Sequence, residues 1–167
     1  MNIFYLDKNP TTCANMMHDK HVVKMILETG QLLSACRVHY NSTCPIAYPK
    51  SVPNHPCAKW VMESKHHYIW LAKHYLALCY EYHRRYNKLH ARHDDYQTYK
   101  VVPAAMPDAR WIDPPRCMPL EYDDGDAISS YRRYYNAEKL WWTRGNDGRR
   151  FKNTWTFPAV KPDWIKK

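Results

Sequence analysis

The chain has 167 residues and a net charge of +9, and 45% of its residues are hydrophobic, values that are ordinary for one globular domain with a single core. No run of about 18 apolar residues occurs, which excludes a membrane-spanning helix, and the first residues lack the basic and apolar regions of a signal peptide. With four glycines in total, a glycine-rich phosphate-binding loop is excluded as well.

The first part of the chain is expected to form an arm and a short helix. Residues 3–6 are compatible with a short strand or an extended arm. A turn at residues 9–12 follows, in which Thr11 or Thr12 is expected to cap a short helix that ends near Met17.

The first firm helix is expected over 19–38, and it carries one polar stripe. His21, Lys24, Glu28 and Gln31 fall within about 80° of one another on a helical wheel. The remaining positions are mostly apolar, so the helix is expected to be buried on most of its circumference. A carboxylate in such a setting is costly to desolvate unless it is paired or used, which makes the stripe a candidate site.

The stripe also has a purely structural interpretation. Lys24 and Glu28 are four residues apart, and such pairs are usually solvated ion pairs on a helix surface. The apolar residues on both sides favour a groove or an interface, and hence a function, over this alternative.

The middle of the chain predicts a proline-rich loop followed by a long helix. Residues 41–56 contain four prolines and are expected to form an ordered loop. Pro56 is expected at the first position of the next helix. Apolar residues then recur every three or four positions from Cys57 to Asn87, which predicts one long amphipathic helix.

The last third predicts a surface loop, a third helix and a tail. Residues 94–119 contain five prolines and are expected to run irregularly over the surface. Residues 123–126 supply a turn and an N-cap for a helix from Ala127 to Trp142, ended by Gly145, and the remainder is expected to be loop and tail. The predicted fold is therefore mainly α: a compact single-domain bundle of three main helices with long proline-rich loops, spanning 1–167.

Histidines and cysteines are numerous but show no metal-binding pattern. The ten histidines are scattered, without an HExxH motif, and no two of the six cysteines form a CxxC pair. The cysteines are expected to be reduced structural thiols, and Cys36 has no catalytic signature around it. The sequence therefore predicts no metal site and no cofactor.

The C-terminal segment 128–167 differs from the rest of the chain in charge. It contains 10 Lys and Arg against 3 Asp and Glu, whereas residues 1–127 contain 15 against 13. Tyrosines and tryptophans are interleaved with these cations, and the combination favours nucleic acid, with cations for phosphates and rings for stacking. The alternative is a solvated basic tail. The candidate contacts are Arg132, Arg133, Arg144, Arg149, Arg150, Tyr134, Tyr135, Trp141 and Trp142.

Three segments resemble the endonuclease V-type pyrimidine dimer DNA glycosylases, a family known from large DNA phages. The first has Asp19, His21 and Glu28 in the pattern Asp-x-His-(six residues)-Glu. The second runs from Pro56 through a helix with the ending Glu-x-x-Arg-Arg at 81–85, and the third is the aromatic-basic stretch 131–135.

This resemblance implies a compact helical enzyme that flips a nucleotide out of duplex DNA, removes a damaged or modified pyrimidine, and then nicks the backbone as an AP lyase. The N-terminal α-amine, at Met1 or Asn2, would attack the sugar C1′ to form an imine. Glu28 would be the acid/base group. Lys24 and Lys20 are alternative imine-forming residues, and His21 and Lys20 are implied contacts to DNA.

Other functions remain compatible with the sequence. A non-enzymatic DNA-binding protein would need only the basic aromatic segment, and a related enzyme acting on modified bases or nucleotides would use the same scaffold. The predicted partner is double-stranded DNA and the predicted state is a monomer without membrane contact. The predicted location is intracellular, in the cytoplasm of a bacterial or phage-infected cell.

Overall fold

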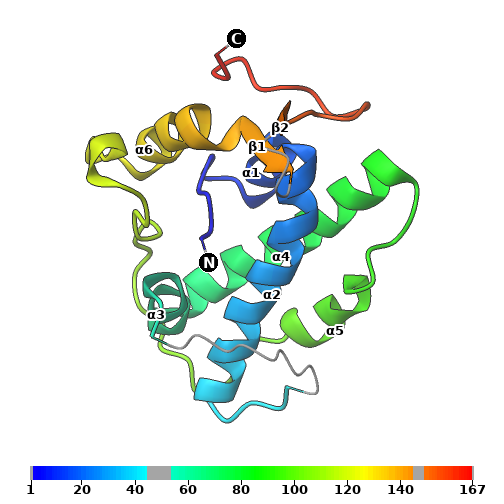
Figure 1. Ribbon diagram of the computed structural model, residues 1–167. Helices are drawn as coiled ribbons and strands as arrows, with labels where there is room; N and C mark the ends of the chain where they lie inside the picture. The colour runs from blue at the N-terminus through cyan, green and yellow to red at the C-terminus, as the bar shows by residue number, and fades with distance from the viewer. Residues whose placement is uncertain (1, 45–53, 145–148, 167) are drawn as a thin grey trace.

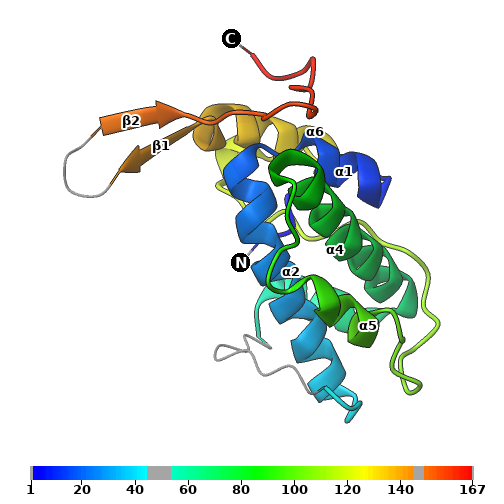
Figure 2. The ribbon, with the colours of Figure 1, turned by 90° about the vertical axis from the view of Figure 1, so that its right-hand side faces the viewer.

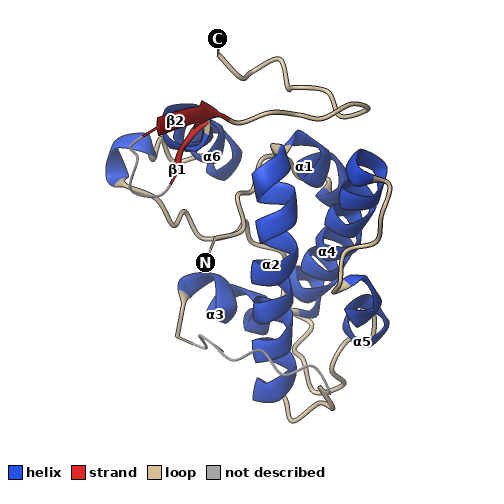
Figure 3. Ribbon diagram, turned by 45° about the vertical axis from the view of Figure 1, so that its right-hand side comes forward, coloured by secondary structure: helices blue, strands red, loops and turns tan. Residues whose placement is uncertain are grey.

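The computed structural model describes residues 2–44, 54–144 and 149–166. These residues are mainly helical, as the sequence predicts, with one small antiparallel hairpin near the C-terminus (Figures 1 and 3). Most of the loop expected over 41–56 lies outside them. The helices are α1 Pro10–Met16, α2 Asp19–His39, α3 Pro56–Glu63, α4 Lys65–Tyr86, α5 Tyr96–Tyr99 and α6 Ala127–Tyr134; the strands are β1 Trp141–Arg144 and β2 Arg149–Lys152. No described helix has both the length and the hydrophobicity needed to cross a bilayer.

The two longest helices, α2 and α4, form the centre of the molecule. They cross and pack against each other, α1 packs on α4, and α3 packs on both (Figure 1). The N-terminal arm, residues 2–6, has no regular secondary structure and is buried beside this pair. The arm is therefore part of the core.

Most of α2 is buried, as the sequence predicts, but one face of it is exposed. Val22, Met25 and Ile26 are completely buried, whereas Val23 and Leu27 are 39% and 43% exposed. Nothing in the described residues covers the face that carries these two side chains together with Lys24, so α2 presents an apolar and basic strip at the surface.

The long helix expected from Cys57 to Asn87 is in fact two helices that break at Ser64. The Ser64 hydroxyl accepts a hydrogen bond from the backbone N–H of His66 at 3.1 Å, which caps α4. The same hydroxyl donates to the carbonyl of Ala109 at 2.7 Å. The helical periodicity continues through the break, which is why the sequence pattern hides it. The start at Pro56 is confirmed.

Two other helix ends differ from expectation. The N-cap of α1 is Asn9, whose side chain accepts from the N–H groups of Thr11 and Thr12, so neither threonine is the cap. The helix that starts at Ala127 is capped by Asp126, as predicted, but it becomes a π-helix over Tyr135–Lys139 and ends before Trp141. Trp141 and Trp142 belong to β1, and Gly145 lies outside the described residues.

The segment after the hairpin packs against the helices and is not a loose tail. In Figure 3 it runs back over the tops of the helices after leaving β2. Trp155 donates its indole N–H to the carbonyl of Met16 at 3.0 Å, and Ile165 is buried.

A buried ion network fastens this segment to α2 and α4. Asp19, at the first position of α2, accepts hydrogen bonds from Arg85 of α4 at 3.0 Å and from the hydroxyls of Thr154 and Thr156 at 2.8 and 2.7 Å. Arg85 has no exposed side-chain surface and also pairs with Glu81 at 2.9 Å. Burial alone would raise the pKa of Asp19, but hydrogen bonds from Thr156, Thr154 and Arg85 hold the pKa below its usual value.

We expect Asp19→Asn to lower the free energy of unfolding by about 3 kcal/mol at neutral pH, because it leaves the buried Arg85 with only one of its two carboxylate partners, Glu81. The depressed pKa means that Asp19 stabilises the fold above its unfolded pKa, about 4, and that this contribution disappears as the pH falls through the lower folded pKa. Urea unfolding at about pH 7 and about pH 3 should therefore show a gap between wild type and variant that closes in acid. Asp94→Asn, at a carboxylate that is 96% exposed, should change neither value by more than about 0.5 kcal/mol.

Candidate active site

The chain's second residue is held next to Glu28 of α2. The backbone N–H of Asn2 donates to Glu28 Oε2 at 3.3 Å. The Asn2 side chain donates to the carbonyl of Cys117 at 2.7 Å, and its oxygen lies 2.6 Å from the hydroxyl of Tyr131 on α6. Because hydrogen bonds to three separate parts of the chain hold Asn2, its position relative to Glu28 is fixed by the fold.

Glu28 uses both carboxylate oxygens. Oε1 lies 3.2 Å from Lys24 Nζ, which is the predicted i,i+4 pair, and Oε2 accepts the Asn2 N–H. The Glu28 side chain is 14% exposed and that of Lys24 is 62% exposed. The pair is therefore not the fully solvated ion pair of the structural interpretation. The Lys24 ammonium is exposed to solvent, whereas the Glu28 carboxylate is mostly enclosed but still accessible from the surface of α2.

The other two residues of the stripe have different positions. His21 is buried, with its ring packed 4.6 Å from Phe4 and 4.1 Å from His18, measured between centroids. Burial lowers the pKa of His21 well below its usual value, so the ring is neutral at physiological pH. A buried neutral imidazole is a poor phosphate ligand, and the expected DNA contact at His21 is not supported. Gln31 is half-buried.

The basic residues of α6 are engaged by other parts of the chain, although Arg133 is exposed. Arg132 donates to the carbonyl of Leu6 at 2.9 Å, and Arg133 pairs with Asp124 at 3.6 Å. Tyr135, expected to offer a stacking surface, is completely buried, and its hydroxyl accepts from the N–H of His18 at 3.1 Å. That expectation was wrong because the helical turn places Tyr135 on the core side of α6. Tyr134 is half-buried.

The hairpin instead carries the exposed cations and rings. Trp141 is 45% exposed, and Arg150 and Lys152 of β2 lie over its ring, 5.4 and 5.9 Å from the centroid. Lys20 of α2 lies over Trp142, which stacks on Phe151 of β2. Arg149 is exposed, while the side chain of Arg144 lies outside the described part of the chain. Figure 2 shows the hairpin projecting from the helical body, at the opposite end from α5.

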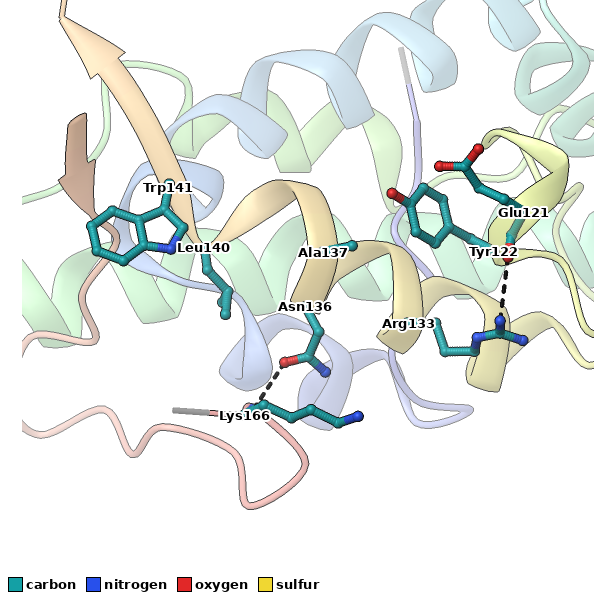
Figure 4. A pocket seen from close by; sticks show the side chains of 8 residues that line it. All are labelled: Glu121, Tyr122, Arg133, Asn136, Ala137, Leu140, Trp141 and Lys166. Carbon is teal, nitrogen blue, oxygen red and sulfur yellow. Dashed lines mark hydrogen bonds between the residues drawn. The ribbon is translucent and has the colours of Figure 1, made fainter. Parts of the chain in front are cut away.

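A hollow of about 560 Å³ lies along α6 and the start of the hairpin (Figure 4). Its walls include Tyr122, Asn136 and Trp141. Two hydrogen bonds join other residues of the wall: Arg133 donates to the carbonyl of Glu121, and the Lys166 N–H donates to Asn136. Neither Asn2 nor Glu28 lines it. We choose the candidate site by the geometry of its reactive groups and not by the size of the hollow. The Asn2–Glu28 pair, in which a nitrogen lies close to a carboxylate, is therefore the candidate site.

Side chains of metal-ligand type gather beside this pair. One ligand atom from each of His55, Cys57 and Cys117 lies within 4.8 Å of the other two. Hydrogen bonding between the two thiols lowers the pKa of Cys117 to about 7 and raises that of Cys57. Cys117 and Tyr131 were not identified as site residues from the sequence, because no local motif links them to Asn2, which is more than 100 positions away.

A family model described as pyrimidine dimer DNA glycosylase matches residues 1–94, which confirms the resemblance seen in the sequence. The matched segment contains Asn2, Lys24 and Glu28, whereas Cys117, Tyr131 and the hairpin follow it. Searches of curated proteins and of solved structures found no match.

We expect Tyr131→Phe to lower the free energy of unfolding by about 1–3 kcal/mol, because it leaves buried polar groups of Asn2, Pro115 and Cys117 without their shared partner. Hydrogen exchange at the amides of Ile3 and Phe4, which donate to the Asn2 side chain, should become faster. Tyr80→Phe, at an exposed hydroxyl on α4, is the matched control and should leave both measurements unchanged. Equal effects from the two variants would contradict the anchoring role.

Proposed function

The chain belongs to the pyrimidine dimer DNA glycosylase family, and we propose that it removes a damaged or modified pyrimidine from double-stranded DNA and then cleaves the strand as an AP lyase. The observation that supports this most is the 3.3 Å contact between the Asn2 nitrogen and the Glu28 carboxylate. Glycosylase–lyase chemistry needs an amine and an acid/base group close together.

The nucleophile in this proposal is the N-terminal α-amine. If Met1 is removed, the amine is the Asn2 nitrogen that already contacts Glu28. If Met1 is retained, the amine is that of Met1, one residue before Asn2, and one residue spans at most about 3.6 Å. An α-amine has a pKa near 8, so a useful fraction is unprotonated at neutral pH, whereas a lysine needs its pKa lowered. Lys24, which also contacts Glu28, is the second candidate.

The proposed reaction has two stages. The amine lone pair forms a bond to C1′, and the bond between C1′ and the base breaks, so that the base leaves with the electron pair and takes up a proton. The amine loses its protons as the sugar ring opens and an imine forms. Loss of a proton from C2′ then expels the 3′-phosphate, and water releases the enzyme. Glu28 is placed to move protons at the nitrogen and to stabilise the cationic imine.

One face of α2 connects this site to the hairpin. Lys20, Lys24 and Glu28 follow one another in steps of four, which places them along the same face. Lys20 and Glu28 are about 12 Å apart along the helix axis, similar to the width of the DNA major groove. Lys20 also touches the hairpin through Trp142. A duplex lying on this face would meet Glu28 and the cations of β2 together, and a single chain would suffice to bind it.

We expect Glu28→Gln to reduce base release and strand nicking by about 10²–10⁴-fold, because it removes the acid/base group while keeping the shape of the side chain. Lys24→Gln is the matched control, since it breaks the same ion pair and leaves the carboxylate, and it should reduce activity by less than about tenfold. Duplexes containing abasic sites or damaged pyrimidines, assayed by gel and by borohydride trapping, measure both.

Trapping also identifies the amine. A short N-terminal extension that is not removed should abolish the trapped complex while Lys24 is intact. Trapping that survives the extension and is lost in Lys24→Gln assigns the imine to Lys24. Absence of both base release and trapping on every DNA substrate would contradict the proposed function. If Glu28→Gln then binds duplex DNA as tightly as the wild type, a protein that only binds DNA is favoured.

The hairpin is expected to contribute phosphate contacts. Combining Arg150→Ala with Lys152→Ala should reduce the slope of log K against log salt for duplex binding by about 2, because each neutralised phosphate contributes about 0.9. Lys100→Ala, at an exposed cation next to α5, is the matched control and should leave the slope unchanged. Equal slopes for wild type and the double variant would exclude the hairpin from the DNA-binding surface.

A further inference from the structure

Three side chains beside the N-terminal arm have the geometry of a metal site. His55 is the N-cap of α3, Cys57 is the second residue of that helix, and Cys117 lies in the loop before α6. Their ligand atoms lie within 4.8 Å of one another, and no other described His, Cys, Asp or Glu joins the group. Two thiols and an imidazole are the ligands that zinc prefers in proteins.

The distance between the two sulfurs carries most of the argument. Cys57 Sγ and Cys117 Sγ are 3.7 Å apart. Two thiolates at about 2.3 Å from a tetrahedral zinc ion stand about 3.8 Å from each other. A disulfide would require about 2.0 Å, so the observed separation matches two ligands of one ion better than a bond between them.

The surroundings of these residues favour their use as ligands. His55 Nδ1 accepts the backbone N–H of Cys57 at 3.1 Å, which fixes the ring beside the sulfurs. When an ion binds, the imidazole lone pair would turn to the metal. The 3.1 Å hydrogen bond from the Cys57 N–H would then be replaced by a metal–nitrogen bond. Cys117 is half-buried, which gives an ion a route in from the surface.

We propose that His55, Cys57 and Cys117 bind one zinc ion, with a water as the fourth ligand. The ion would fasten the loop that carries Cys117 to the start of α3. That loop also holds Asn2, because the Cys117 carbonyl accepts a hydrogen bond from the Asn2 side chain and the Cys117 N–H donates to Tyr131, which itself contacts Asn2. Zinc would therefore act as a structural clamp that keeps Asn2 beside Glu28. Metal binding itself does not depend on the proposed glycosylase activity.

The test is a titration of the reduced full-length chain with Co²⁺ and then Zn²⁺, without DNA. We expect one Co²⁺ per chain, with thiolate-to-cobalt charge-transfer absorption and the visible bands of tetrahedral cobalt, both removed by Zn²⁺. Cys57→Ser and Cys117→Ser should each weaken binding by more than about 100-fold, beyond the usual cost of losing an outer-shell partner. Cys44→Ser changes a half-buried thiol outside the group and should bind like wild type.

Alkylation of the wild-type chain provides a readout that does not require folded variants. Zn²⁺ should protect the half-buried Cys117, but not the half-buried Cys44, from iodoacetamide, as mapped by mass spectrometry. Absence of saturable cobalt binding by the reduced chain would overturn the proposal. So would equal protection of Cys117 and Cys44 by Zn²⁺, or a Cys57–Cys117 disulfide in a protein that binds no metal after reduction. Because no assay step involves DNA, failure here is distinguishable from failure of the glycosylase proposal.

Discussion

The buried guanidinium of Arg85 is the constraint on which the arrangement of the helices depends. It pairs with Asp19 and Glu81 and donates to the carbonyl groups of Met17 and Asn15, so one side chain joins α4 to the end of α1 and the start of α2. A buried cation must have its donors satisfied, and a shift of any of these elements would leave one unpaired. Asp19 extends the network to Thr154 and Thr156 and thereby draws the C-terminal segment onto the N-terminus of α2.

This packing makes the N-terminal arm a part of the core and not an appendage. Ile3, Tyr5 and Leu6 are almost completely buried, and Phe4 adopts a positive φ of 51°, which is uncommon outside glycine. Phe4 also packs against the rings of His21 and Tyr135. An arm held in this way has little freedom at Asn2, which suits the proposed chemistry, in which the N-terminal amine must lie close to Glu28.

Local patterns in the sequence predicted the elements well where neighbouring residues decide the structure. The bounds of α2, the start of α3 at Pro56 and the Asp126 cap all follow from residues a few positions apart. The failures have long-range causes: Ser64 ends a helix partly by bonding to Ala109, and Tyr135 is buried by the N-terminal arm and His18. The same holds for the site. Glu28 was found from its stripe, whereas Tyr131 and Cys117 reach Asn2 only through the fold.

The division between the family-matched segment and the rest of the chain therefore does not separate a complete active site from an accessory region. Residues 1–94 contain the amine-bearing end and Glu28. Two of the three groups that hold Asn2, however, are Cys117 and Tyr131, and both lie beyond that segment. The hydrogen bonds of Asp19 with Thr154 and Thr156 likewise join a residue of the matched segment to residues that follow it. The later part of the chain supplies the contacts that hold the first residues in place, so the geometry at Glu28 is a property of the whole fold. In these terms the C-terminal segment is more than a basic tail: its buried residues help to hold Asn2 beside Glu28, and its exposed hairpin carries the cations and rings of the proposed DNA-binding surface.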